Sequence, residues 1–491
     1  MHPFYHTLPR ASSFHAHFQP MWLRRAGERS RIIGMKVCKF GGSSVADAAQ
    51  ITKVCEIMAS DRDRRVVVVS APGKRSGDDV KVTDMLITCA ERALEDFDVT
   101  REAEAISQRF SSIVADLGLD SALAGEIDAD IRARLASDKD DKGAFLDLMK
   151  AAGEDNSAKI VAAALKARGV PAVYLNPAKA GMLLEGPPGD AVLCDVSYGF
   201  LHDAIERAMW SPDNPIVVFP GFFGVNRDGK VATFPRGGSD ISGAILAAAM
   251  KAECYENFTD VDTVYAVDPR VVPDVAHGIR EMTYREMREL AYAGFGVFHD
   301  EAVMPAFRAG IPINIRNTNK PALPGTWILP TRRADECRVV GIASDSDFVH
   351  VYVEKYMMNR EVGFGRRLLQ IFEEEGVSFE HMPTGIDNIT VILRGAKFPV
   401  EAQARVLQRI KGELAPDHLV CERDHALIMV VGEGMQHTVG TAARATKALA
   451  EAGVNIELIN QDASEISIMF GVREAERARA VNVLYHAFFG A

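Results

Sequence analysis

Short, nearly continuous apolar runs alternate with amphipathic stretches from residue 36 to about residue 329. Runs of this kind are typical of strands that are buried on both faces of a sheet. Between them, residues 80–170 are rich in charge and in helical periodicity, which predicts a helical layer with solvated faces. The alternation predicts an α/β fold with a mostly parallel central sheet and helices on both faces. The expected strands are 37–40, 66–70, 172–175, 216–220, 254–258 and 313–316.

The end of the chain follows a different pattern and contains an internal repeat. Gly-Val-Ser-Phe-Glu at 376–380 recurs as Gly-Val-Asn-Ile-Glu at 453–457, and the match continues without a gap from 387–392 to 464–469. An expected helix precedes each copy (365–375 and 442–452), and an expected strand precedes each helix (348–353 and 426–431). The order β-α-β-β predicts two ferredoxin-like modules. We therefore expect domains at 35–330, 340–415 and 420–491.

Residues 1–34 do not match the rest of the chain. They are rich in His, Arg, Phe and Pro, contain one acidic residue, Glu28, and have no apolar core of a signal peptide. Met35 stands directly before the first expected strand. We expect a disordered or mis-started N-terminal extension without packed structure.

Composition narrows the functional classes. With 491 residues, 47% hydrophobic and 25% charged, the chain has the composition of a multidomain globular protein. A net charge of −11 argues against a general nucleic-acid or membrane surface, and no run approaches the ~18 apolar residues of a membrane span. The seven cysteines form no Cys-x-x-Cys pair, which indicates reduced thiols and a cytoplasmic location.

The first candidate site is the stretch Lys39-Phe40-Gly41-Gly42-Ser43-Ser44. It follows an apolar run and opens onto a helical pattern near Val45. Glycine backbone N–H groups at a helix N-terminus form an anion site, to which Lys39 adds a full positive charge. Taken alone, the stretch fits a tight turn with a solvated lysine equally well.

A second stretch strengthens the anion-site interpretation. Arg236-Gly237-Gly238-Ser239-Asp240 precedes an alanine-rich helix expected at about 241–252, for which Ser239 or Asp240 suits the N-cap. Arg236 can bind a carboxylate through two parallel hydrogen bonds. A capped helix with an incidental arginine explains this loop alone, but two such loops in one α/β pattern favour a site for a small anionic substrate.

These loops, together with several shorter motifs, resemble the aspartokinases of the amino-acid kinase superfamily. The shorter motifs are Gly-Glu-x-x-Ser at 153–157, Thr-Asp-Val-Asp at 259–262, Asp-Pro-Arg at 268–270, Asn-Thr at 317–318 and Pro-Gly-Thr at 324–326. They occur in the family's order over residues 36–491, and the repeated modules resemble tandem ACT domains. The resemblance implies transfer of the γ-phosphoryl group of ATP to the side-chain carboxylate of L-aspartate, with feedback control by an end-product amino acid.

The resemblance also implies roles for individual residues. Lys39 and Asp240 are the expected catalytic residues, with Arg236 on the substrate α-carboxylate and Glu154 on its α-ammonium. Mg²⁺ is expected to bridge phosphate oxygens and to keep its waters, so no dedicated metal-ligand cluster is expected. The expected ATP-binding residues are Lys39, Phe40, Gly41, Gly42, Ser43, Thr259, Asp260, Tyr265, Arg270, Gly296 and Val297. The expected substrate-binding residues are Thr83, Glu154, Arg236, Gly237, Gly238 and Ser239.

Two positions depart from the family pattern. Relatives carry a lysine that contacts ATP where this chain has Gly296, and Pro235 replaces a more usual glycine. The missing charge puts the nucleotide contact at Gly296 in doubt.

The ACT-like modules imply regulation and assembly. Met358, Gly363, Phe364 and Glu380 are the expected effector-binding residues, for lysine or threonine, with Glu380 on an expected strand that also carries Ser378. Edge strands of such modules pair across subunits, which predicts at least a dimer. Two alternatives stay open: a kinase for glutamate or acetylglutamate, and a catalytically silent amino-acid sensor. The ACT-like pair and the Arg236 loop argue against the first alternative. The second is disfavoured by the intact charged residues Lys39, Glu154, Arg236 and Asp240.

Overall fold

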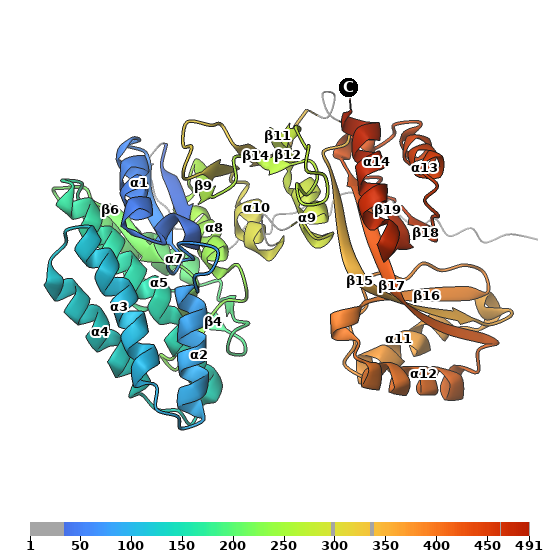
Figure 1. The fold of residues 1–491 in the computed structure, drawn as a ribbon, viewed down its shortest axis with the longest axis horizontal. Helices are drawn as coiled ribbons and strands as arrows, with labels where there is room; N and C mark the ends of the chain where they lie inside the picture. Colours follow the sequence, from blue (N-terminus) through green and yellow to red (C-terminus); the bar gives the residue numbers. More distant parts are fainter. Residues whose placement is uncertain (1–33, 296–299, 334–337, 462, 491) are drawn as a thin grey trace, which may run out of the picture.

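The computed structural model describes residues 34–295, 300–333, 338–461 and 463–490. Figure 1 shows two lobes, with the sequence running from the first lobe (blue to green) through α9 (Tyr284–Tyr292) and α10 (Met304–Ala309) to the second (orange to red). The N-terminal extension, apart from Gly34, lies outside the described residues, as do Gly296 and Val297. No helix among the described residues combines the length and apolar character needed to cross a membrane.

An eight-stranded sheet forms the centre of the first lobe, in the order β12-β14-β13-β9-β1-β2-β6-β3. All neighbouring strands are parallel except the β13–β14 pair. The six strands expected from sequence are confirmed. The strands are β1 (Lys36–Phe40), β2 (Arg64–Val69), β3 (Ala172–Tyr174), β6 (Ile216–Pro220), β9 (Cys254–Thr259), β12 (Glu281–Thr283), β13 (Ile313–Asn317) and β14 (Thr326–Leu329).

Helices cover both faces of this sheet because alternate residues of each strand point to opposite sides. Cys38 and Phe40 of β1 belong to a buried cluster with α1 (Ala48–Ala59), α2 (Val82–Leu94), α3 (Thr100–Asp116), α4 (Ser121–Leu135) and α5 (Lys142–Ala167). Val37 belongs to a second cluster with α7 (Ser197–Met209), α8 (Gly238–Met250), α9 (Tyr284–Tyr292) and α10 (Met304–Ala309). The expected helical layer within residues 80–170 is confirmed as α2–α5.

Helix α8 begins earlier than the sequence pattern indicated. Gly237, at φ +85°, is the N-cap, and Gly238 is the first helical residue. The expectation that Ser239 or Asp240 caps the helix is wrong, because glycine adopts the left-handed conformation at this turn without strain. Both side chains lie instead in the first turn, where the helix dipole favours the negative charge of Asp240.

The second lobe has a five-stranded antiparallel sheet in the order β16-β15-β17-β19-β18. Its strands are β15 (Gly341–Glu354), β16 (Asn388–Arg394), β17 (His418–Val431), β18 (Leu458–Asn460) and β19 (Ser467–Arg473). Its helices are α11 (Phe364–Glu374), α12 (Val400–Leu414), α13 (Thr441–Glu451) and α14 (Arg477–Phe489).

The two long strands run through both ACT-like units. One half of β15, from Phe348 to Glu354, pairs with β16, whereas residues 341–345 pair with the far end of β17. Residues 341–345 therefore complete the sheet of the second ACT-like unit, although they precede the first unit in the sequence. The predicted domain boundary between residues 415 and 420 stays a proposal. The prediction of a strand that carries Ser378 and Glu380 is wrong. The segment is irregular, and an isolated β-bridge joins His381 to Ile392.

Candidate active site

The two glycine-pair loops meet at the carboxyl end of β1. Lys39 is buried, and its Nζ lies 2.5 Å from Oδ1 of Asp240 in the first turn of α8. This edge is where the parallel strands β1, β2, β9 and β6 end together. In open α/β sheets such an edge is the usual place for a ligand. The contact brings together the two residues that the family resemblance marked as catalytic.

The first loop packs closely against its surroundings at Gly42, whereas a Cβ atom at Gly41 would be at ordinary contact distance. A Cβ atom at Gly42 would lie 3.0 Å from the Ala71 carbonyl oxygen, and one at Gly41 would lie 3.6 Å from Lys39 Nζ. The Gly41 N–H donates to the carbonyl of Phe258 at 3.2 Å, so one of the expected backbone donors to phosphate is already bound within the sheet. Phe40 is buried and stacks on Phe258 with ring centroids 4.7 Å apart.

The second loop is fixed from behind by Gly221. A Cβ atom on Gly221 would lie 2.7 Å from the Cβ atom of Ser239, so only glycine allows this approach. Ser239 is buried, whereas the Arg236 side chain is exposed. The structure therefore holds the backbone of the loop beside Lys39 and leaves the Arg236 guanidinium at the surface of the site.

A buried carboxylate lies near the same cation. Glu154, in α5, is 5% exposed, and its Oε2 has no hydrogen-bond partner among the described residues. Burial raises the pKa of Glu154 to about 8, while backbone hydrogen bonds and the nearby charge of Lys39 act in the opposite direction. One helical turn later, Ser157 is also buried with an unpartnered Oγ. Thr83, half-buried at the start of α2, lies on the helix that packs against α5.

An unsatisfied buried carboxylate is costly unless a ligand completes it. Glu154 is therefore suited to a cationic group of a substrate. Ser157 belongs to the Gly-Glu-x-x-Ser motif, but the spacing of that motif gave Ser157 no role. What distinguishes Ser157 in the structure is a buried hydroxyl without a hydrogen-bond partner among the described residues.

The residues expected for the nucleotide lie on the neighbouring strand ends. The Thr259 carbonyl, at the end of β9, accepts from the Thr318 N–H at 2.9 Å, and Thr318 Oγ1 lies 2.6 Å from Ser44 Oγ of the first loop. Asn317 Nδ2 donates to the Asp260 carbonyl at 3.2 Å. Ser43, half-buried, precedes Ser44 in the 3-10 turn Gly42–Val45. These contacts place Thr259 and Asp260 on the same edge as Lys39.

Tyr265 and Arg270 lie farther along the same segment. Tyr265 belongs to β10 (Val264–Tyr265) and is half-buried. The Arg270 side chain is 85% exposed and pairs with Asp268 at 2.7 Å within its own turn. The structure brings Arg270 into a local ion pair rather than into contact with the other described site residues.

The sequence did not mark Asn257, yet this residue contacts the Lys39–Asp240 pair. Its Nδ2 donates to Asp240 Oδ1 at 2.9 Å, and it is the register partner of Lys39 across the β1–β9 pair. The available signal was the polar pair Glu256-Asn257 in the middle of an otherwise largely apolar strand pattern.

The expected effector residues lie in the first unit of the second lobe. Gly363, at φ +82°, caps α11, and Met358 and Phe364 are buried beside it. Glu380 accepts a hydrogen bond from the hydroxyl of Tyr292, at the end of α9 in the first lobe. Arg394 Nε lies 3.7 Å from the same carboxylate. A residue expected to bind an effector is therefore linked to a helix of the first lobe.

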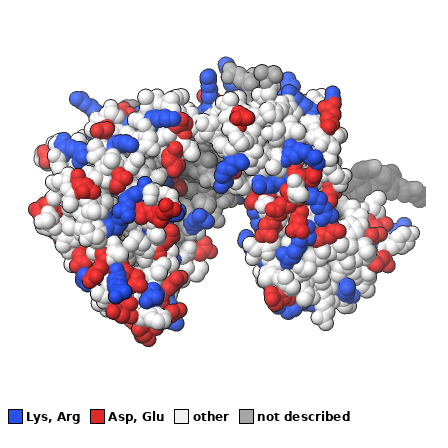
Figure 2. All heavy atoms as spheres, in the orientation of Figure 1, with Lys and Arg blue, Asp and Glu red and all other residues white. Residues whose placement is uncertain are grey.

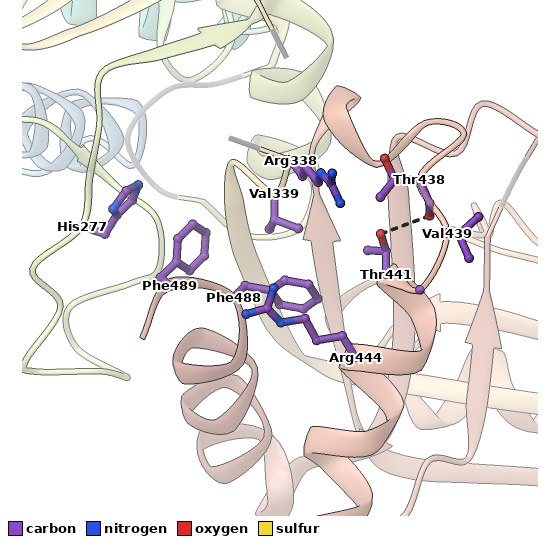
Figure 3. A pocket seen from close by; sticks show the side chains of 10 residues that line it. His277, Arg338, Val339, Thr438, Val439, Thr441, Arg444, Phe488 and Phe489 are labelled. Carbon is purple, nitrogen blue, oxygen red and sulfur yellow. Dashed lines mark hydrogen bonds between the residues drawn. The ribbon is translucent and has the colours of Figure 1, made fainter. Parts of the chain in front are cut away.

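A separate cavity of about 570 Å³ lies at the second unit (Figure 3). It is lined by His277, Arg338, Val339, Thr438, Val439, Gly440, Thr441, Arg444, Phe488 and Phe489. None of the expected site residues that the structure describes is among them. Figure 2 shows basic and acidic side chains interspersed over the visible face of both lobes. Among the described residues, no group of three or more His, Cys, Asp or Glu side chains is arranged to hold a metal ion.

Comparisons with known proteins point to one family. The profile of the amino acid kinase family matches residues 34–317, and that of the ACT domain matches residues 428–488. Aspartokinase 3 of Bacillus subtilis is 51% identical over 455 residues, which cover 93% of this chain and 99% of that relative.

Solved structures agree with these matches. The aspartate kinase of Clostridium acetobutylicum is 35% identical, with a TM-score of 0.80 over 92% of this chain and 100% of that one. Aspartokinase III of E. coli, in complex with aspartate and ADP, is 23% identical, with a TM-score of 0.74 over 93% of this chain and 100% of that one. At that identity the second likeness concerns the fold alone.

Proposed function

The chain belongs to the amino acid kinase family, and within it to the aspartokinases, and we propose that the cleft at Lys39 transfers the γ-phosphoryl group of ATP to the side-chain carboxylate of L-aspartate. A carboxylate oxygen forms a bond to the γ-phosphorus while the bond to the β,γ-bridging oxygen breaks. The products are 4-phospho-L-aspartate and ADP. The contact between Lys39 and Asp240, which joins the two loops, is the observation that carries this proposal.

The residues of the cleft act through charge and position. The aspartate carboxylate is ionised at neutral pH, so the transfer needs no side chain to remove a proton from the nucleophile. Lys39 neutralises the charge that develops on the transferred group and on the leaving oxygen, and Asp240 holds the ammonium in place. Gly41, Gly42 and Ser43 shape the loop around the phosphates, with Gly42 and Ser43 as the proposed backbone donors.

Complementary charges bind the amino-acid substrate. Arg236 closes on the α-carboxylate when substrate enters, and Gly237, Gly238, Ser239 and Thr83 complete that side of the site. Glu154 binds the α-ammonium, which supplies the missing partner of its buried carboxylate. Ionisation of Glu154, whose pKa lies at about 8 in the ligand-free protein, is favoured by the incoming positive charge.

The nucleotide lies on the neighbouring strand ends. Thr259, Asp260 and Tyr265 line the adenosine pocket, Phe40 supports it from within the sheet, and Arg270 leaves its local ion pair to reach the phosphates. Gly296 and Val297 belong to this site by family resemblance. Asp240 is the carboxylate that would hold Mg²⁺ through water, which fits a metal bound chiefly by phosphates. Bound Mg²⁺ supplies positive charge to the β- and γ-phosphate oxygens.

The direct test is a coupled assay for ADP together with hydroxamate trapping of the acyl phosphate. We expect product with L-aspartate, ATP and Mg²⁺, and background rates with glutamate or acetylglutamate. Product with glutamate or acetylglutamate instead would identify another amino-acid kinase. ADP release and acyl phosphate both at background, in a folded protein that binds lysine or threonine, would identify a silent sensor.

Regulation and assembly belong to the second lobe. We propose that lysine or threonine binds at Met358, Gly363, Phe364 and Glu380 and lowers activity. We also propose a homo-oligomer, at least a dimer, because large apolar side chains beside these residues are exposed, among them Met357, Val362 and Phe379. Inhibition and thermal shift with lysine, threonine and methionine test the first proposal, and sedimentation equilibrium tests the second.

We place the protein in the cytoplasm. Cys38, Cys55, Cys89, Cys194, Cys254 and Cys421 all carry free thiols, which suits a reducing compartment.

A further inference from the structure

Asn257 lies in the middle of the hydrogen-bonded sheet and directs its side chain at the catalytic pair. It is 4% exposed on β9, opposite Lys39 in the parallel register with β1. Register partners on neighbouring strands point to the same face. Asn257 and Lys39 therefore both face the first turn of α8.

Both side chains bind the same atom. Lys39 Nζ lies 2.5 Å from Asp240 Oδ1, and Asn257 Nδ2 donates to this oxygen at 2.9 Å. The hydroxyl of Tyr255, two residues earlier on the strand, donates to the Asp240 backbone carbonyl at 3.2 Å. Strand β9 thus fixes the main chain and the carboxylate of Asp240 at separate points.

We propose that Asn257 is a positioning residue for phosphoryl transfer, since its amide fixes the Asp240 carboxylate and thereby the Lys39 ammonium at the edge of the sheet. This inference rests on the proposed function of the same cleft. Without the amide, Lys39 alone would hold the carboxylate, and the pair would sample several rotamers. A neutral donor also adds no charge beside the Lys39–Asp240 pair, so the amide fixes the carboxylate without competing for the ammonium.

Two substitutions separate the effect of the Asn257 hydrogen bond from the effect of its packing. Leucine has a similar size but no donor, so N257L removes the hydrogen bond and keeps the packing. Aspartate has the same shape but adds a charge within reach of Asp240 and Lys39. Two carboxylates sharing one site raise the pKa of one of them, and the protonated form can donate as the amide does.

Steady-state kinetics with aspartate and ATP provide the test. We expect N257L to lower kcat about tenfold to a hundredfold, because small misplacements of reacting groups have effects of this size. Its KM for aspartate and its affinity for ADP, measured by calorimetry, should stay within about threefold of wild type. For N257D, the ratio of its kcat to the wild-type kcat should increase as the pH is lowered from about 8 to about 6.

N314L is the matched control. Asn314 is equally buried on the next strand, β13, but its amide donates to the Pro324 carbonyl, away from the pair. It should change thermal stability and leave kcat within about twofold of wild type. A kcat loss in N314L equal to that in N257L, or a wild-type kcat in folded N257L, would overturn the inference.

If N257L does not fold, the pH dependence of N257D decides, and a constant ratio to wild type counts against the inference. Failure of the wild-type chain to phosphorylate aspartate would instead count against the proposed function.

Discussion

The two faces of strand β9 carry buried charges that are organised in opposite ways. On one face, Glu256 binds Arg64 and Arg316, each at 2.6 Å, and its side chain is 4% exposed. Burial alone would raise its pKa, but the hydrogen bonds and charges of the two arginines bring the pKa below its usual value. Both guanidinium groups also lie over the Phe258 ring at 5.5 Å. The charges of this cluster are paired with one another, although Arg316 Nε has no hydrogen-bond partner among the described residues.

On the other face, the charges are only partly satisfied. Asn257, the next residue along β9, contacts the Asp240–Lys39 pair, and the Asp240 side chain is 18% exposed. Nearby, Glu154 is buried without a hydrogen bond to its Oε2. One face thus uses buried charge to hold strands together, whereas the other leaves polar groups that a ligand can complete. The charged side chains on both faces are largely buried. The two faces differ in how completely those side chains are paired with hydrogen-bonding or oppositely charged groups.

The largest expected effect comes from breaking the satisfied face. E256Q leaves the buried Arg64 and the half-buried Arg316 without a full negative charge, and removal of one partner from a buried charge cluster typically destabilises by about 3–5 kcal/mol. Chemical denaturation should show this loss, with kcat of the folded fraction little changed. E102Q is the control, since Glu102 pairs with Arg92 at the surface and should contribute less than about 1 kcal/mol. Equal free energies of unfolding for E256Q and E102Q would show that the Glu256 cluster contributes no more to stability than a surface ion pair.

Removal of the Lys39 cation on the other face of β9 should lower activity and leave stability nearly unchanged. K39A should lower kcat by at least about a hundredfold, which corresponds to roughly 3 kcal/mol of transition-state stabilisation, and should keep the fold. K36A is the control, because Lys36 lies on the same strand but pairs with Asp61 away from the cleft. Turnover of K39A near the wild-type value would exclude Lys39 from the mechanism.

The incomplete partner set of Glu154 predicts a pH effect on stability. A folded-state pKa of about 8, above the usual 4.5, means that the folded protein binds this proton more tightly than the unfolded chain does. The stabilisation is fully present below about pH 4.5 and is lost as the pH rises towards about 8. Melting temperatures of ligand-free wild type should therefore fall over this range more than those of E154Q, and E154Q should bind aspartate more weakly. Parallel curves for the two proteins would contradict the assignment.

The smallest expected effect concerns the Glu380 carboxylate of the second lobe, which accepts a hydrogen bond from Tyr292 of the first lobe. Y292F removes the hydroxyl that donates to Glu380 and keeps the ring. If an effector ammonium competes for Glu380, the variant should bind the effector about threefold to fivefold more tightly, the equivalent of one hydrogen bond. Inhibition curves with lysine and threonine measure this, with Y356F, an exposed tyrosine of the same unit, as control. Unchanged curves would place effector recognition elsewhere.

The pattern of apolar residues was enough to predict six strands of the central sheet and the helical layer, but it missed the strands β12 and β14 at one edge of the sheet. Burial on both faces of the sheet leaves a continuous apolar run at each strand, which is visible in the sequence. The irregular segment at Ser378 and Glu380 was not predictable in this way, because the repeat preserved strand-like composition where the fold makes an isolated bridge. The sharing of β15 and β17 between the two units was equally hidden, since pairing between distant strands leaves no local signal.

By itself, the sequence determined which residue types stand at the strand ends: a lysine before one glycine pair, and an arginine and an aspartate around another. These signals are local, because glycine geometry and helix starts depend on a few neighbouring residues. Only the tertiary structure decided that Asp240 reaches Lys39, that Asn257 holds the same oxygen, and that Glu154 lacks the partners that Glu256 has. Register and packing across some 200 residues of chain set those contacts, and a buried charge acquires its role from the groups packed around it.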